Sequence, residues 1–382
     1  MLVLITGGAG FIGSRTALAL RARGHDVRIL DNLHPQIHTA DPQNSPTWRL
    51  VADQFPSVIA DINDRDAVSR ALDGCEAVVH LAAETGTGQS MYEIERYVRT
   101  NIGGTAILLE QIMARAQTFK RVVVASSRSI YGEGAYRCPT HNVVTPQPRT
   151  TERMRAGRFE VSCPLCDGEV ELIPTTEAAA VSPASVYAVT KLSQEQLVAA
   201  TCTAAAVPWL ALRYQNVYGP GQSLNNPYTG VLSVFSRLML AGSPVEIFED
   251  GKESRDFVYI DDVVAANVAA VEAPPQITGS LNVGSGVATP LEILVNQLAK
   301  NYGYSGDVRV SGRFRAGDIR HNVADVSQLA KRLGLSSRTT FSQGIAEFCR
   351  WVKEELAAST AEKSDGGYQH SLAELEARGL IN

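Results

Sequence analysis

The sequence lacks long apolar runs, an excess of basic residues and a charged amino-terminal leader. No apolar stretch in its 382 residues approaches the ~20 residues that a membrane helix needs, and the opening MLVLITGGAGFIG has no basic segment typical of a secretory signal. The formal net charge of −5 provides no field that would attract nucleic acid or an anionic membrane. We therefore expect a cytoplasmic protein with neither of these partners, in which local groups hold any anionic ligand.

Cysteine is also scarce, with six residues in the chain, which excludes the disulfide-dense scaffold of a small secreted protein. Cys75, Cys202 and Cys349 lie in apolar or helical contexts and are expected to be buried, unreactive thiols. The other three lie close together between residues 138 and 166. Hydrophobic residues make up 45% of the chain, which is enough for one large domain or two joined domains.

The amino-terminal segment reads as a strand, a glycine turn, a helix and a second strand that ends in an acid. Gly7 permits a tight turn, Gly10 lets the backbone approach a pyrophosphate, and Gly13 allows the helix to pack closely on the strand. Free N–H groups at the helix start favour an anion. Asp31 can accept hydrogen bonds from both hydroxyls of an adenosine ribose and would repel a 2′-phosphate, so the pattern predicts NAD rather than NADP.

Strand and helix patterns then alternate through VIADINDRDAVSRAL, AVVHLAAET and RVVVASS. This alternation predicts the α/β class, with a doubly wound parallel sheet of the Rossmann type. Ligands of such sheets bind beyond the carboxyl ends of the strands, which are expected at Asp61, Ile62, Ala82, Ala83 and Ser126.

The segment YAVTK places Tyr187 and Lys191 four residues apart, on one face of a helix. A phenol is a weak base near neutral pH, but a nearby ammonium and a positive nicotinamide would favour the phenolate, so we expect a lowered pKa for Tyr187. Ser127 ends a predicted strand and could bind the same substrate hydroxyl.

Seven motifs occur in the order TGGAGFIG, HLAA, SSRSIYG, YAVTK, RYQNVYGPG, RDFVYIDDVV and NVGSG. Together they resemble the extended short-chain dehydrogenase/reductase family, and within it the NAD-dependent nucleotide-sugar epimerases and dehydratases. The resemblance implies Ser127, Tyr187 and Lys191 as catalytic residues, with Asn101 as a structural or fourth catalytic member. It assigns to the NAD site Gly7, Gly10, Phe11, Ile12, Gly13, Asp31, Asn32, Asp61, Ile62, Leu81, Ala82, Ala83, Asn101, Ser126, Tyr187 and Lys191.

The resemblance also implies a nucleotide-sugar site in the second half of the chain. Asn216 and the arginines of RDFVYIDDVV and RAGD would meet the diphosphate and ribose, a task that suits guanidinium groups; surface ion pairs are the alternative role for these arginines. The expected substrate residues are Thr85, Ser127, Arg128, Asn216, Val231, Arg255, Arg315 and Asp318.

These assignments imply three units and a tail. Residues 1–133 and 171–218 form the NAD-binding Rossmann domain, to which 258–275 returns. Residues 134–170 form an insertion. Residues 219–257 and 276–355 form a smaller α/β nucleotide-sugar domain, and 356–382 a tail with a short amphipathic helix. Family members commonly dimerise through two helices of the sheet domain, so we expect a homodimer.

Epimerisation fits the residues better than the neighbouring reactions of the family. Hexose dehydratases carry an Asp and a Glu after the catalytic hydroxyl residue, whereas Arg128 and Ser129 stand there in this chain, so a proton donor for dehydration is missing. Reductases of the family frequently use NADP, which Asp31 disfavours. The expected reaction is oxidation at C4 by tightly held NAD, with Tyr187 as the base, turning of the 4-keto sugar, and reduction of its opposite face. A UDP-hexose or UDP-uronate epimerase, a dehydratase or a reductase is the alternative.

The insertion separates Tyr131 from Tyr187 by more residues than the family has there. It contains Cys138, His141, Cys163 and Cys166 as C-x2-H and C-x2-C pairs, which predict a closed, structural zinc site. A loop with incidental thiols is the alternative; its arginines could also suggest a nucleic-acid contact, which the interspersed acids and the acidic chain disfavour.

SRSIYGEG followed by this insertion resembles the enzymes grouped as dTDP-L-rhamnose 4-epimerases, and the insertion could form a wall of the sugar pocket. A non-catalytic, redox-sensing NAD protein is a second class of function, which the Ser, Tyr and Lys set argues against because a sensor needs no general base.

Overall fold

Seven parallel strands form the centre of the computed structural model, which describes residues 1–39, 41–224, 226, 230–315, 317–358 and 367–381. Their order across the sheet is β13-β9-β5-β4-β1-β2-β3. The strands are β1 (Leu2–Thr6), β2 (Asp26–Asp31), β3 (Ser57–Ile59), β4 (Ala77–His80), β5 (Arg121–Ser127), β9 (Trp209–Tyr214) and β13 (Gly279–Val283). The chain reverses its direction of winding between β1 and β4, so the predicted Rossmann-type parallel sheet is confirmed.

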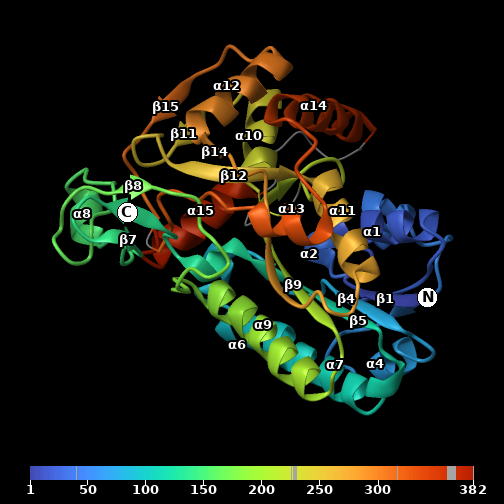
Figure 1. Ribbon diagram of the computed structural model, residues 1–382. Helices are drawn as coiled ribbons and strands as arrows, with labels where there is room; N and C mark the ends of the chain where they lie inside the picture. The colour runs from blue at the N-terminus through green and yellow to red at the C-terminus, as the bar shows by residue number, and fades with distance from the viewer. Residues whose placement is uncertain (40, 225, 227–229, 316, 359–366, 382) are drawn as a thin grey trace.

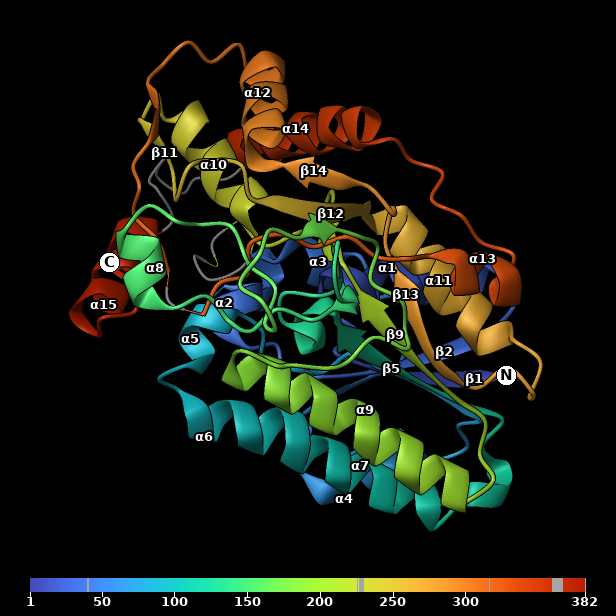
Figure 2. The same cartoon turned by 60° about the vertical axis from the view of Figure 1, so that its left-hand side comes forward.

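Helices cover both faces of this sheet (Figure 2). Alternate residues of each strand supply two separate cores: Val3 and Ile5 pack toward α1 and α11, whereas Leu4 packs toward α4, α7 and α9. These helices are α1 (Phe11–Ala22), α4 (Arg65–Ala71), α7 (Gly104–Met113), α9 (Val186–Ala204) and α11 (Ile260–Glu272). Shorter helical segments lie between these elements: α2 (Pro35–His38), η1 (Pro42–Asn44), α3 (Pro46–Arg49), α5 (Thr87–Ser90), α6 (Ile94–Tyr97), η2 (Val98–Gly103), η3 (Ala116–Thr118) and η4 (Arg128–Tyr131).

A second α/β unit lies above the carboxyl edge of the sheet (Figure 1). Its strands are β10 (Asn216–Tyr218), β12 (Ser254–Tyr259) and β14 (Ala288–Pro290), with the pair β11 (Val245–Ile247) and β15 (Val308–Val310) beside them. The helices α10 (Val231–Leu240), α12 (Leu291–Tyr302) and α14 (Phe341–Ala358) pack with them around their own apolar core. The cleft between a dinucleotide sheet and such a unit is the usual place for a substrate.

Residues at the edge of the sheet depart from the expected division of the chain. We placed 276–355 in the second unit, but Gly279–Val283 pairs in register with β9 as an edge strand of the large sheet. Its Leu281 and Val283 are buried in the core beside α11, and α13 (Ser327–Leu333) packs on it. The sequence did not reveal this strand, because a run as short as LNV is too short to show the alternation of apolar and polar residues that marks a strand.

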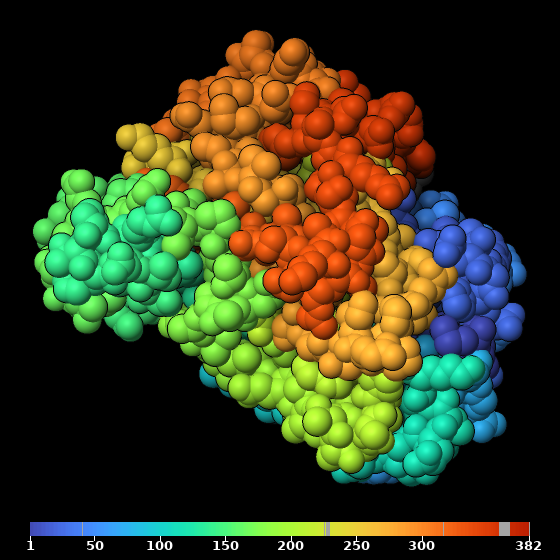
Figure 3. Space-filling model, in the orientation of Figure 1, coloured from blue at the N-terminus to red at the C-terminus, as the bar shows by residue number. Residues whose placement is uncertain are grey.

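The insertion forms a separate lobe at the side of the molecule, green in Figure 3. Its strands β6 (Tyr136–Cys138), β7 (Asn142–Val144) and β8 (Glu171–Leu172) make a small antiparallel sheet. The short helix α8 (Thr151–Arg155) lies between β7 and β8 in the chain. Five buried residues form its core, two of them the cysteines Cys138 and Cys163. So small a core is insufficient to fold a lobe by itself.

The final helix, α15 (Tyr368–Ala377), joins the core of the second unit through Tyr368, Leu372 and Leu375. The expected amphipathic tail helix is thus present and packs on the body of the protein. None of the helices in the described residues is long and apolar enough to span a membrane. Cys75, Cys202 and Cys349 are buried and unpaired, as expected.

Candidate active site

The glycine turn after β1 has the shape of a dinucleotide cradle. Gly7 has a φ of +67°, and a Cβ on it would meet the backbone nitrogen of Ala82 at 2.8 Å. A Cβ on Gly13 would collide with the carbonyl oxygen of Gly7, so only glycine lets α1 begin so close to the turn. A Cβ on Gly10 would meet nothing nearer than the same oxygen, at 3.3 Å. This side of the turn is therefore open to a ligand.

The first turn of α1 presents backbone N–H groups to this open side. No side chain in the described part of the chain caps the helix, and the N–H groups of Phe11, Ile12 and Gly13 lie at its start, where a pyrophosphate can accept them. Asp31 ends β2 beside the turn, and its buried carboxylate accepts the N–H of Ala9 at 3.0 Å. The carboxylate keeps further lone pairs for ribose hydroxyls, so these residues fit NAD.

Other expected cofactor residues lie on the same edge of the sheet. Asn32 donates to the carboxylate of Asp61 at 3.1 Å. Burial tends to raise the pKa of Asp61, but hydrogen bonds from nearby amides outweigh this effect and hold the pKa below its usual value. Leu81 and Ala82 donate their N–H groups to the backbone and hydroxyl oxygens of Thr6, which fixes this strand end beside the glycine turn.

Two expected cofactor residues direct their side chains elsewhere. Ile62 is buried against Gly104, where a Cβ would collide with it. Ser126 donates its hydroxyl to Glu195 at 2.6 Å. Ala83 is half-buried directly after the β4 edge. Ile62 and Ser126 would therefore contact a cofactor through their backbone atoms. A contact of this kind cannot be predicted from the types of side chain in the sequence.

Hydrogen bonds at its start fix α9, which carries the tyrosine and the lysine. Ser185 caps the helix by accepting the N–H of Ala188 at 3.2 Å. The N–H of Tyr187 donates to the hydroxyl of Ser90 at 3.0 Å. Three strands hold the helix one turn beyond Lys191, because Glu195 accepts hydrogen bonds from Arg213 of β9, Ser126 of β5 and Ser280 of β13 at 2.5, 2.6 and 2.7 Å.

Asn101 occupies a π-helical turn, a deviation that often accompanies functional sites. Its fully buried amide accepts the N–H of Glu84 at 2.7 Å and donates to the carbonyl of Glu84 and the hydroxyl of Thr190 at 3.1 and 2.9 Å. Asn101 thus ties the loop after β4 to α9, next to Lys191.

The electrostatics of the tyrosine differ from our expectation. Burial raises the pKa of Tyr187, opposed by a side-chain hydrogen bond with Ser127 and by the charge of Arg128. Burial also lowers the pKa of Lys191 to about 7, against the opposing charge of Glu195. In the protein alone, burial thus outweighs the groups that would lower the pKa of Tyr187, and the effect of a bound nicotinamide on it stays a prediction.

A buried network that the sequence did not reveal holds the lysine. Lys191 donates to the side-chain oxygen of Gln194 at 2.5 Å, and Gln194 donates to Thr105 at 2.7 Å. The ring nitrogens of His80 lie 2.7 Å from the Thr6 hydroxyl and 2.9 Å from that of Thr105. Burial lowers the pKa of His80 to about 3, so its ring is neutral. Gln194 lies one helical turn after Lys191, and this spacing could have indicated from the sequence that the two side chains are in contact.

A row of charged residues leads away from the tyrosine. Arg128 follows Ser127, and no hydrogen-bond partner for its guanidinium lies among the described residues; burial lowers its pKa to about 10. Arg255 donates to the carboxylate of Asp318 at 3.2 Å and is held further by three backbone carbonyls, those of Ser254, Ile319 and Arg320. Burial opposes the ionisation of Asp318, but the surrounding arginines, Arg255 first, keep its pKa below the usual value.

The remaining expected substrate residues are placed as follows. Asn216, at the start of β10, has a buried amide oxygen without a partner in the described ranges. Val231 is the first residue of α10. The carbonyl of Thr85 accepts the hydroxyl of Tyr97 at 2.6 Å. Arg315 stacks over the ring of Phe248, with 5.2 Å between the guanidinium carbon and the ring centroid.

Buried ion pairs connect the insertion to the second unit. Arg149 donates to Glu249 at 2.7 Å, and its guanidinium also lies 3.3 Å from the carboxylate of Glu133. Arg320, fully buried, contacts Glu249 at 2.9 Å and Glu160 of the insertion at 2.6 Å. Arg149 of the insertion therefore acts inside the protein, a role that the sequence did not indicate because its partner Glu249 lies far along the chain.

The four predicted metal ligands come together in the insertion. Their ligand atoms all lie within 4.8 Å of one another. The sulfurs of Cys138 and Cys166 are 3.8 Å apart, and the His141 Nδ1 lies 3.6 Å from the sulfurs of Cys138 and of Cys163. Two sulfurs of a tetrahedral zinc site, with Zn–S of about 2.3 Å, lie about 3.8 Å apart. The spacing of these four residues therefore fits zinc.

Known proteins resemble the chain over most of its length. The model of the NAD dependent epimerase/dehydratase family matches residues 3–153 and 162–284. A dTDP-L-rhamnose 4-epimerase of Burkholderia thailandensis is 37% identical over 356 residues, which cover 93% of this chain and 95% of that protein.

Two solved structures share the fold. The UDP-glucose 4-epimerase of Thermotoga maritima with UDP-glucose is 28% identical, with a TM-score of 0.75, and covers 93% of this chain and 100% of its own. The UDP-glucuronic acid 4-epimerase of Bacillus cereus, in complex with UDP-glucuronic acid and NAD, is 27% identical, with a TM-score of 0.75 and coverage of 93% and 99%.

Proposed function

Since the chain belongs to the NAD dependent epimerase/dehydratase family, we propose that it is a nucleotide-sugar 4-epimerase that acts on a dTDP-deoxyhexose such as dTDP-L-rhamnose. That it is an NAD-dependent nucleotide-sugar epimerase follows from its relatives and structural neighbours. The observation that carries the finer proposal is the match over nearly the whole chain to a dTDP-L-rhamnose 4-epimerase.

In the proposed reaction, different residues of this chain bind the cofactor, transfer the proton and orient the sugar. The glycine turn, the first turn of α1 and the Asp31 carboxylate would hold NAD, which when bound accepts and returns a hydride at C4 of the sugar. Tyr187 takes the proton of the 4-hydroxyl and later returns it. Ser127, whose side chain opposes the rise of the Tyr187 pKa, would help to hold the tyrosine oxygen and the sugar hydroxyl in line.

The chemistry also requires the sugar to turn between its two reactions with the cofactor. Arg255, fixed by three carbonyls and Asp318, suits an anchor for the diphosphate, because its orientation is already determined before the anion binds. The amide N–H groups of Asn216, at the start of β10, would be further donors to the diphosphate. An anchored diphosphate leaves the hexose free to present its opposite face to the cofactor.

The substrate can be tested directly by proton NMR. Purified protein without added cofactor is incubated in turn with dTDP-L-rhamnose, UDP-glucose and UDP-glucuronate. We expect the C4 epimer of dTDP-L-rhamnose to accumulate to equilibrium, with slower or absent conversion of the UDP sugars. Faster conversion of UDP-glucuronate would instead support a UDP-uronate 4-epimerase, a function favoured by the similarity to the Bacillus cereus enzyme.

We further propose that Cys138, His141, Cys163 and Cys166 bind one structural zinc ion. The distances between their ligand atoms support this assignment, as does the small core of the insertion, which leaves ordering free energy to be supplied by a metal. Four protein ligands would complete a tetrahedral shell, so the ion would have no open position for a substrate.

A further inference from the structure

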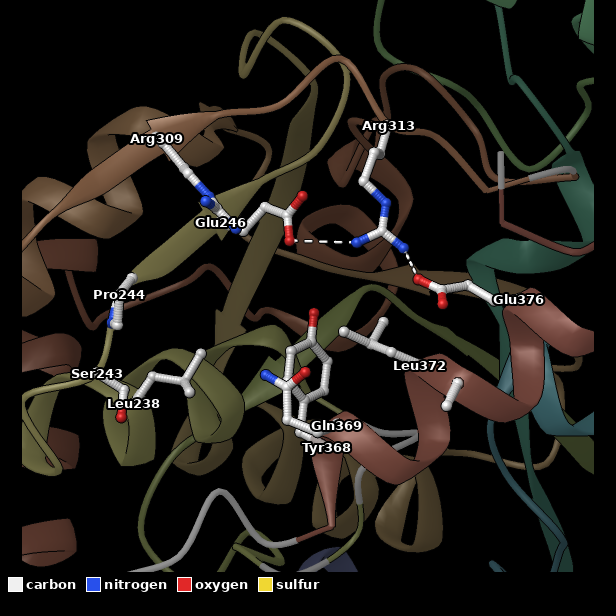
Figure 4. Close-up of a pocket in the computed structure, with 11 residues that line it drawn as sticks. Leu238, Ser243, Pro244, Glu246, Arg309, Arg313, Tyr368, Gln369, Leu372 and Glu376 are labelled. Carbon is white, nitrogen blue, oxygen red and sulfur yellow. Dashed lines mark hydrogen bonds and ion pairs between the residues drawn. The ribbon is translucent and has the colours of Figure 1, made fainter.

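The segment that follows β15 contributes two of the expected substrate residues. This RAGD segment comprises residues 313–315 and 317–321. Its first residue, Arg313, lines a cavity between the second unit and α15, and forms ion pairs with Glu246 of β11 and Glu376 of α15 (Figure 4). The second unit and α15 therefore hold the start of the segment.

The later part of the RAGD segment lies beside the catalytic helix. Gly317 has a φ of +79°, and a Cβ on it would lie 3.4 Å from the carbonyl oxygen of Ala184. Ala184 comes two residues before the start of α9, and Tyr187 is the second residue of that helix. This part of the segment thus lies at the same end of α9 as the proposed base.

Polar contacts attach this later part to the insertion. Arg149, whose side chain is 2% exposed, donates from Nη2 to the carbonyl oxygen of Asp318 at 3.0 Å and from Nη1 to Glu249 at 2.7 Å. Glu160 of the insertion accepts two hydrogen bonds from the guanidinium of Arg320, at 2.6 and 2.8 Å. Because the guanidinium of Arg149 is almost inaccessible to water, its hydrogen bond fixes the backbone at Asp318 more firmly than an exposed one would.

Apolar packing joins the insertion to the same segment. Met154 of α8, Phe159 and Phe314 form a small buried cluster of their own, to which the RAGD segment contributes Phe314. The carbonyl oxygen of Phe159 also accepts a hydrogen bond from Nη1 of Arg149 at 3.1 Å. The insertion thus orients the guanidinium that it presents to the segment.

Asp318 and the two residues after it orient Arg255. The Asp318 carboxylate accepts a hydrogen bond from Nη2 of Arg255 at 3.2 Å. The carbonyl oxygens of Ile319 and Arg320 accept hydrogen bonds from the same guanidinium at 2.9 Å each. These three acceptors all belong to the RAGD segment, so a shift of its backbone would turn the guanidinium of Arg255.

We propose that Arg149 of the insertion is a positioning residue for substrate binding, which fixes the RAGD segment and thereby holds Arg255 in the orientation that receives the diphosphate. The proposal rests on the proposed function, since it takes Arg255 as the anchor of that diphosphate. A guanidinium that is already oriented binds an anion more tightly, because no ordering cost remains when the anion arrives. Arg149 acts through the backbone of Asp318 and touches no substrate atom.

Calorimetry with dTDP measures this effect without turnover. Arg149→Lys keeps a positive charge beside Glu249, so that the carboxylate stays paired, but one ammonium cannot occupy the places of both Nη1 and Nη2. Arg153→Lys is the matched control, because Arg153 donates to Ser162 and Asp167 within the insertion. We expect R149K to weaken dTDP binding about 10-fold, as for the loss of one well-placed hydrogen bond, and R153K to bind dTDP like the wild type. Both variants should keep the metal and NAD content of the wild type.

Two further readouts separate positioning from general damage to the fold. R149K should raise the KM for the nucleotide sugar about 10-fold and leave kcat within about 2-fold of the wild type, because the groups at C4 are unchanged. In an R255M background, R149K should weaken dTDP binding by less than about 2-fold, since the group that Arg149 positions is absent. A loosened fold would instead weaken binding equally in both backgrounds.

A dTDP affinity of R149K equal to that of the wild type, an equal loss in R153K, or additive effects of R149K and R255M would overturn the proposal. The outcome for the reaction itself is separate. If the wild type epimerised none of the tested sugars while R149K, but not R153K, weakened dTDP binding, the positioning role of Arg149 would stand and the proposed reaction would fail.

Discussion

Burial decides the chemistry of individual side chains in this site. Burial disfavours the charged forms of both Tyr187 and Lys191. It therefore raises the pKa of the tyrosine and lowers that of the lysine to about 7. Only Ser127 and Arg128 favour the phenolate in the protein alone. The sequence suggested Ser127, Tyr187 and Lys191 as catalytic residues, but it could not give this balance of pKa shifts, which depends on how much solvent the neighbouring elements exclude.

Replacing Tyr187 with Phe removes the base and little else, because the ring can stay packed on the same helix. General acid–base catalysis contributes about 10²- to 10⁴-fold, so kcat should fall by at least about 10²-fold while the bound NAD, measured after denaturation, is unchanged. Val189→Ala, an exposed change on the same helix, should keep full activity. A Y187F protein with wild-type kcat would remove the tyrosine from the mechanism.

The pH dependence of the unfolding free energy can test the effect of burial on the carboxyl group of Glu253. Burial raises the pKa of this carboxyl to about 7, and its Oε2 has no hydrogen-bond partner among the described residues. A raised folded pKa means that the neutral acid stabilises the fold below the unfolded pKa, near 4.5, and that this contribution is lost as the pH rises through about 7. Glu253→Gln mimics the neutral acid. Its unfolding free energy should match the wild type at pH 4 and exceed it by about 1–3 kcal/mol at pH 8.

The same comparison with Glu292→Gln, at an exposed position on α12, should show no such pH dependence. Thermal or urea unfolding at the two pH values is sufficient for the measurement. A difference between E253Q and the wild type that is equal at pH 4 and pH 8 would contradict a titrating Glu253.

Local patterns predicted some elements well and others poorly. The glycine turn and α1 were predictable because Gly13 is required by its close approach to Gly7, six residues earlier, and Gly7 by its own positive φ. The cysteine and histidine pairs were predictable from their spacing, although their approach to one another needed the β6–β8 sheet. The role of Arg149 was not, because its partner Glu249 lies a hundred residues away.

Removal of the proposed zinc should act first on the insertion. Cys163→Ser is expected to lose about one zinc ion per chain and to expose the bonds after Arg153, Arg155 and Arg158 to trypsin, since the small core cannot hold the lobe by itself. Leu165→Ala, an exposed change between two of the ligands, should keep both the metal and the resistance to trypsin. Metal analysis and limited proteolysis provide the measurements. Wild-type protein without zinc, or C163S as resistant as the wild type, would contradict a structural ion.

At the scale of the whole molecule, the order of strands and helices followed from the sequence more readily than the boundaries between units. Alternating apolar segments predicted the parallel sheet, but the edge strand Gly279–Val283 lies beyond a segment of the second unit and joins the sheet only through β9. The position of α15 was equally hidden, because its contacts at Tyr92 and Arg313 come from two distant parts of the chain. Long-range contacts of this kind leave no periodic signal in a short window.

Epimerisation through resident NAD can be tested in one experiment, proton NMR of the reaction carried out in D₂O with dTDP-L-rhamnose and no added cofactor. A hydride that moves to NAD and back never exchanges with solvent. The account predicts that the C4 epimer forms with its full C4 proton signal and with no deuterium at C3 or C5. Deuterium at C4, or a product that forms only when a reduced cofactor is supplied, would contradict it.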